Sequence, residues 1–130
     1  MKKFILILIS MCFIFPELTL AVVRTQEIYG IYSNLEYNEE GGDLLGMELF
    51  IFPGDQYYAL IQSSEGEPSK PYLLPLTPTG DDGILIEYPP ECIVRKITGT
   101  IFKDRLVIRV HYKSHATDPI SLRRGDSYWQ

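Results

Sequence analysis

Turn signals interrupt this chain roughly every ten residues, and no apolar stretch between them repeats with the 3.6-residue period of a helix. The segments between the turns are rich in Val, Ile and Tyr, which predicts short β-strands. The predicted strands are 28–33, 45–52, 56–62, 84–88, 93–102, 105–112 and 120–123. A single short helix at 33–40 or 113–119 is an alternative for those two stretches.

One further apolar segment, residues 71–78, carries prolines at 71, 75 and 78. Proline has no N–H to donate to a neighbouring strand. The segment is therefore predicted to be an edge strand or an extended stretch outside the sheet.

The turns themselves indicate how the strands pair. Tight connections at 53–55 and 103–104 favour hairpins between consecutive strands. We therefore predict an all-β fold, an antiparallel meander that closes into a small barrel of seven or eight strands, with a β-sandwich as the alternative. An eight-stranded barrel is just wide enough to fill itself with side chains or to hold one small ligand.

The N-terminus has the pattern of a signal peptide. Lys2 and Lys3 precede an apolar run at 4–15, and Thr19 and Ala21 occupy the −3 and −1 positions of a small-residue cleavage site. The run is shorter than the ~20 residues that span a bilayer, so we expect no stable membrane anchor after cleavage. The prediction is a signal peptide at 1–21, a single domain at 22–130, and a periplasmic or secreted protein, with the Lys-Lys start typical of bacteria.

Charge is unevenly distributed along the chain. Residues 22–91 hold two basic and thirteen acidic residues, a net charge of −11, whereas residues 92–130 hold eight basic and three acidic residues, a net charge of +5. Either the two halves pair in the fold so that charges complement each other across strands, or a basic face meets an anionic partner. The acidic overall balance, −5, argues against a nucleic-acid partner.

The strand at 105–113 has the clearest alternation. Leu106, Ile108, Val110 and Tyr112 fall on one face, and the other face carries the basic stripe, which we define as Arg105, Arg109, His111 and Lys113. The stripe is either a solvated outer face that discourages edge pairing or an anion-recognising surface to which Arg123 or Arg124 adds a donor. The alternation alone leaves open which face is buried.

Patterns that would indicate catalysis or metal binding are absent from the sequence. His111 and His115 are four residues apart in a predicted strand and loop, where they do not share a face as on a helix. No nucleophile elbow, phosphate loop or dinucleotide fingerprint occurs. Cys92 is the one cysteine after the predicted cleavage site, and its apolar neighbours predict a buried thiol. We expect no catalytic residues, no metal and no cofactor.

Two short motifs resemble the lipocalin (calycin) family. The first strand contains Gly30-Ile31-Tyr32, and the chain closes with Ser-Leu-Arg-Arg-Gly at 121–125. In lipocalins a Gly-x-Trp on the first strand packs beneath an arginine from the last strand. The resemblance implies that Tyr32 takes the place of the tryptophan, with Arg123 or Arg124 as its partner. It also implies a barrel that binds small apolar or amphipathic ligands, although some exported bacterial relatives act as chaperone-like or inhibitor modules.

Two functions are consistent with these features. The first is non-catalytic binding of a small apolar or anionic ligand, which predicts a cavity of at least ~300 Å³. The alternative is a protein-interaction module, such as an inhibitor or envelope-assembly factor, which predicts a filled core and an exposed patch of several hundred Å². The candidate binding residues are Tyr32, Arg109, His111, Lys113 and Arg123.

Overall fold

The computed structural model describes residues 27–130, and within that range the chain is all β with no helix. The predicted signal peptide at 1–21 lies outside the described residues. The nine strands are β1 (Gly30–Ser33), β2 (Glu36–Asn38), β3 (Asp43–Phe52), β4 (Tyr57–Gly66), β5 (Tyr72–Thr79), β6 (Gly83–Glu87), β7 (Val94–Ile101), β8 (Arg105–Tyr112) and β9 (Ile120–Arg124).

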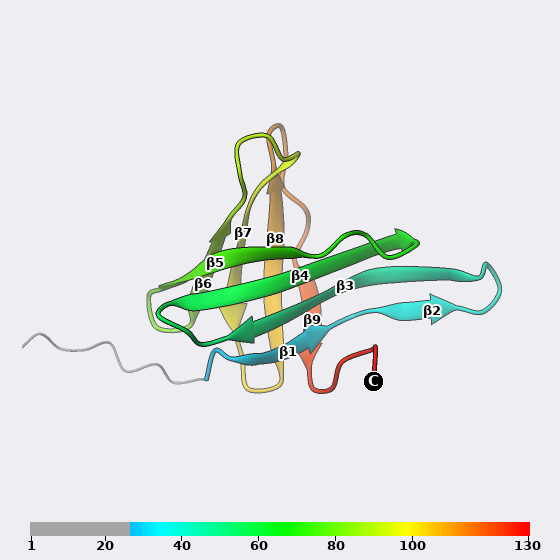
Figure 1. The fold of residues 1–130 in the computed structure, drawn as a ribbon, viewed down its shortest axis with the longest axis horizontal. Coiled ribbons are helices and arrows are strands. Elements are labelled where there is room, and N and C mark those ends of the chain that lie inside the picture. The colour runs from blue at the N-terminus through cyan, green and yellow to red at the C-terminus, as the bar shows by residue number, and fades with distance from the viewer. Residues whose placement is uncertain (1–26) are drawn as a thin grey trace, which may run out of the picture.

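Eight of these strands close into an antiparallel barrel (Figure 1). Strands β3 to β8 each pair with the next strand in the chain, and β1 completes the ring because it pairs with both β3 and β9. Strand β2 extends past the barrel and pairs with the first residues of β3. The predicted meander and barrel are confirmed, and the sandwich is not adopted. The alternative helix at 33–40 is also not formed, because β2 occupies that stretch.

A local break separates β1 from β2, although both pair with β3. At the break, the Asn34 N–H donates to the Met47 carbonyl at 3.0 Å, and the Met47 N–H donates to Asn34 Oδ1 at 2.7 Å. Gly46 sits opposite with φ +113°, and a Cβ there would lie 2.6 Å from the Asn34 carbonyl oxygen. Only glycine fits this close approach of two backbones.

The proline-containing segment is β5, and the prediction of an edge strand or a non-sheet segment is wrong. Residues 72–76 of β5 pair with β4, and residues 76–79 pair with β6. Pro75 therefore faces a partner only on the β4 side, and Pro78 only on the β6 side. The stagger of the barrel gives each proline one unpaired side, so neither has to donate a ladder hydrogen bond there.

Alternate residues of every barrel strand point inward and form one apolar core. Its most buried members lie near the turns that join β3 to β4, β5 to β6 and β7 to β8, together with Ile28 ahead of β1. They are Ile28, Tyr32, Leu49, Ile51, Ala59, Leu76, Ile84, Ile86, Ile97, Ile101, Leu106, Ile108 and Leu122. These side chains fill one end of the barrel, which we call the closed end.

Candidate functional site

The opposite end of the barrel is hollow. It lies where β4, β6 and β8 end and where β3, β5, β7 and β9 begin, and it holds a cavity of about 420 Å³. The lining residues come from all eight barrel strands or from the loops next to them. This volume exceeds the ~300 Å³ at which small-ligand pockets begin.

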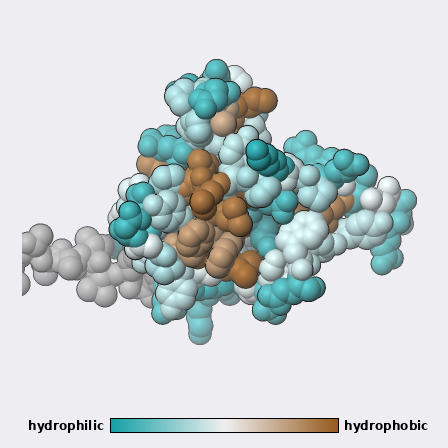
Figure 2. Space-filling model, viewed as in Figure 1, coloured by the Kyte–Doolittle hydropathy of each residue, from teal (hydrophilic) through white to brown (hydrophobic). Residues whose placement is uncertain are grey.

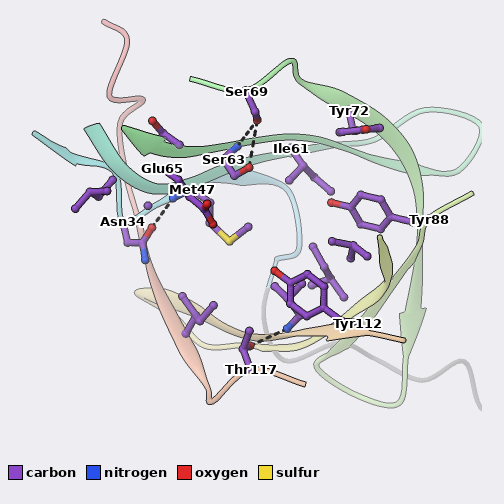
Figure 3. Close-up of a pocket in the computed structure, with 17 residues that line it drawn as sticks. Asn34, Met47, Ile61, Ser63, Glu65, Ser69, Tyr72, Tyr88, Tyr112 and Thr117 are labelled. Atoms are coloured by element: carbon purple, nitrogen blue, oxygen red, sulfur yellow. Dashed lines mark hydrogen bonds between the residues drawn. The ribbon is translucent and has the colours of Figure 1, made fainter. Parts of the chain in front are cut away.

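Three tyrosines form one side of the cavity (Figure 3). Tyr72 begins β5, Tyr88 follows β6 and Tyr112 ends β8. The ring centroids of Tyr72 and Tyr88 lie 5.6 Å apart at an interplanar angle of 58°. The Tyr112 ring stacks on His115 at 4.8 Å, and the Tyr112 N–H donates to the His115 carbonyl at 2.8 Å. The turn after β8 thus fixes the position of Tyr112.

Two of the tyrosine hydroxyls are directed into the cavity. Figure 3 shows the hydroxyls of Tyr88 and Tyr112 pointing toward its centre. Burial raises the pKa of Tyr88 to about 12, with smaller contributions from the nearby Tyr72, Cys92 and Tyr112. Tyr88 therefore keeps its proton at neutral pH and remains a hydrogen-bond donor.

The small polar side chains elsewhere in the lining already have partners in the protein. The hydroxyls of Ser63 and Ser69 lie 3.2 Å apart, and Thr117 Oγ1 accepts from the Val110 N–H at 3.0 Å. The side chain of Asn34 is engaged by Met47. By contrast, the hydroxyls of Tyr88 and Tyr112 have no hydrogen-bond partner among residues 27–130.

The predicted site residue Tyr32 lies in the core at the closed end, not in the cavity. It is fully buried, and its hydroxyl donates to the Ile28 carbonyl at 3.0 Å. Of the two candidate arginines, Arg124 is the one that packs on it, with its Cζ 5.5 Å from the ring centroid. Arg124 also donates to the Tyr29 carbonyl at 2.6 Å, whereas Arg123 is exposed on the outer face. A Cβ at Gly30 would meet the Arg124 Nε at 3.1 Å, so the glycine leaves room for the guanidinium.

The orientation of β8 places the basic stripe on the outside of the barrel. Leu106, Ile108 and Val110 are buried, so the opposite face is turned to solvent. On that face Arg109 and Lys113 are exposed, and half-buried His111 is hydrogen-bonded to Thr98 Oγ1 at 2.8 Å. Arg109, His111, Lys113 and Arg123 thus neither line the cavity nor join Tyr32.

Two arginines of this outer face oppose each other across neighbouring strands. Arg105 of β8 is the register partner of Arg123 in β9. Arg105 forms an exposed ion pair with Asp104, its neighbour in the chain, at 3.2 Å. An opposite-charge pair across strands also occurs, between Glu87 of β6 and Lys96 of β7. One register pair thus places opposite charges from the two halves of the chain across neighbouring strands, and the outer face of β8 carries exposed basic side chains.

A separate apolar row lies on the outside of β3, β4 and β5. Phe50, Leu60 and Leu73 are register partners in successive strands, and they are 42%, 39% and 58% exposed. Figure 2 shows apolar surface gathered over this part of the barrel. The row faces away from both the cavity and the core.

The C-terminal tail crosses the outside of the barrel after β9. The Gly125 N–H donates to the Ile31 carbonyl at 3.0 Å, which brings the tail over β1. Ser127 Oγ then donates to Glu48 Oε1 at 2.5 Å, and the Tyr128 N–H donates to Glu48 Oε2 at 2.9 Å. Glu48 in β3 is only 8% exposed, so the tail supplies the hydrogen bonds that a buried carboxylate needs.

Cys92 lies beside Tyr88 and is half-buried, whereas the sequence predicted a buried thiol.

In residues 27–130 no three His, Cys, Asp or Glu side chains gather into a metal-binding group. No helix in the same part of the chain is long and apolar enough to cross a membrane.

The three cavity tyrosines are not among the binding residues predicted from the sequence. Strands β6 and β8 run in the same direction, so Tyr88 just after β6 and Tyr112 at the end of β8 meet at one end of the barrel, where β5 begins with Tyr72. In a meander, strands that run in the same direction end at the same end of the barrel. Tyrosines at the ends of such strands were therefore the feature of the sequence that could have indicated the site.

Comparison of the chain with protein-family models, with curated proteins and with solved structures finds no match in any of the three.

Proposed function

We propose that this protein is exported and binds a small apolar or amphipathic ligand, without catalysis, in the open end of its barrel. The observation that carries the proposal is the cavity of about 420 Å³ with the hydroxyls of Tyr88 and Tyr112 directed into it. Ligand pockets combine an apolar lining with a few polar groups that orient the ligand. Ile61, Ile97 and Val110 supply the apolar floor here.

The packing of Arg124 on Tyr32 supports a lipocalin-like arrangement. In lipocalins and in this protein, an aromatic residue of the first strand lies beneath an arginine of the last strand. Here Gly30 leaves room for Arg124. In this proposal Tyr32 stabilises the closed end and leaves ligand contact to the opposite end.

Native mass spectrometry of protein purified from its own host tests the proposal. We expect a co-purifying small molecule that is released on denaturation. Val94→Trp places a large ring at the mouth of the cavity and should lower ligand occupancy, whereas Thr100→Trp on the exposed outer face of the same strand should not. Equal occupancy in both variants would place the ligand elsewhere.

A second function is favoured by the basic stripe. Like charges directly opposite each other in a sheet are destabilising, and Arg105 opposes Arg123. An anionic protein partner would offset that repulsion, so we propose this surface as the docking face if the protein is an interaction module. The double variant Arg109→Glu/Lys113→Glu should then abolish capture of the partner, and unchanged capture would refute this second proposal.

Export is tested separately from binding. We expect the protein recovered from the periplasm or the medium to begin at Val22, which intact mass and N-terminal sequencing will show. A chain that retains residues 1–21 would contradict the proposed cleavage.

A further inference from the structure

The lining of the cavity is nearly free of charge. Among the residues that form it, Glu65 at the end of β4 is the one carboxylate, and no Lys, Arg or His contributes to the lining. The basic stripe cannot compensate, because it points to the outside of β8. A carboxylate or phosphate head group would therefore lose its water without gaining a cationic partner, and Glu65 would repel it.

The hydroxyls of Tyr88 and Tyr112 can each donate a hydrogen bond to an acceptor in the cavity. Tyr88 and Tyr112 lie close enough to influence each other electrostatically, and neither hydroxyl has a hydrogen-bond partner among the described residues. The hydroxyls of Ser63, Ser69 and Thr117 each already make a hydrogen bond within the protein. A cationic head group would find Glu65 and the tyrosine rings favourable, but it has no lone pair to accept from the tyrosine hydroxyls, whereas a carbonyl or ester oxygen does.

The remaining surface is suited to a hydrocarbon tail. Met47, Ile61, Ile97 and Val110 line the cavity, and Ile97 and Val110 continue directly into the buried core. A tail that enters between them would remove apolar surface from water at roughly 25 cal/mol per Å².

We infer that the cavity selects an uncharged amphiphile whose head group is a hydrogen-bond acceptor, held by the hydroxyls of Tyr88 and Tyr112 with its tail against the apolar floor. This inference rests on the proposed ligand-binding function. It narrows that function by excluding anionic ligands from the cavity.

The test compares three ligands that share a ten-carbon chain: methyl decanoate, decanoate and decyltrimethylammonium. Each competes with the uncharged fluorescent probe N-phenyl-1-naphthylamine on the full chain at neutral pH. We expect methyl decanoate to bind at least about tenfold more tightly than either charged ligand. Decanoate would bury a charge without a cationic partner, and decyltrimethylammonium would leave both tyrosine hydroxyls without an acceptor. The double variant Tyr88→Phe/Tyr112→Phe should weaken ester binding about tenfold through loss of the hydroxyl donors.

A matched control is Tyr58→Phe, which also removes a hydroxyl. Tyr58 Oη donates to Asp55 Oδ1 at 2.9 Å, away from the cavity, so this variant should bind the ester as the parent does. If decanoate or decyltrimethylammonium binds as tightly as the ester, the inference fails and the ligand-binding function stands. If none of the three ligands displaces the probe, the binding function fails and the inference fails with it.

Discussion

Adjacent arginines near the C-terminus have different surroundings because side chains alternate along β9. Arg124 faces inward with Leu122 and meets Tyr32, whereas Arg123 faces outward opposite Arg105. The sequence motif left the choice between them open, since the register of β9 against β1 was unknown. The register pairs Tyr32 with Arg124, so Arg124 and not Arg123 is the arginine that contacts the Tyr32 ring.

Arg124→Ala should therefore lower the free energy of unfolding by about 1–3 kcal/mol, because it removes the contact with the Tyr32 ring and the hydrogen bond to Tyr29. Arg123→Ala is the matched control and should change it by less than about 0.5 kcal/mol. Urea denaturation measures both. Equal losses in the two variants would contradict the assignment.

Tyr88 should make the fold sensitive to alkaline pH. Its pKa is about 12 in the folded protein against an ordinary value of 10.0, so between these values the unfolded chain loses the proton while the folded chain keeps it. The contribution to stability is complete below pH 10 and is lost as the pH rises toward 12. In Tyr88→Phe the free energy of unfolding should fall less steeply across this window, and an unchanged slope would refute the effect.

At the scale of strands, sequence patterns predicted where most strands lie along the chain. They did not predict which face of β8 is buried or that β5 pairs with strands on both sides. The alternation in β8 separated its two faces, but only burial of Leu106, Ile108 and Val110 shows which one points inward. In β5 the prolines do lack a ladder partner on one side, but the strand as a whole pairs with both β4 and β6. A staggered barrel provides one-sided positions inside a strand, and the local sequence does not reveal that stagger.

The break between β1 and β2 depends on Gly46. Gly46→Ala should destabilise the protein by about 1–4 kcal/mol, because φ is +113° and the added Cβ would collide with the backbone of Asn34. Gly125→Ala is the control, since a Cβ there meets nothing within 4 Å, and it should have little effect. Thermal melting of the two variants tests the difference, and equal midpoints would argue against the break as a constraint.

At the scale of the whole molecule, the meander explains why the residues of the cavity could not be predicted from local sequence patterns. The cavity draws on residues as distant as Asn34 and Ile120, which meet only when the barrel closes. The sequence predicted a barrel able to hold a small ligand, but the residues it selected for binding lie at the closed end or on the outer face. Which end is hollow depends on side-chain volumes summed over eight strands, and no single motif encodes it.

The C-terminal tail should contribute to the stability of the whole barrel. Deletion of residues 126–130 removes both donors to Glu48 and should cost about 1–3 kcal/mol, with faster amide exchange in β1 and β9. Deletion of Gln130 alone should have little effect. A truncated chain as stable as the parent would contradict this role.

The pairing order also has a consequence for folding. From β3 to β9 each strand pairs with its neighbour in the chain, so six hairpins can form from local contacts alone. The seam between β1 and β9 is different, since Arg124 and Tyr29 are 95 residues apart and only two residue pairs join the strands. Bringing such distant segments together has the largest entropic cost of loop closure. We therefore expect the hairpins to form first and the pairing of β1 with β9 to form last.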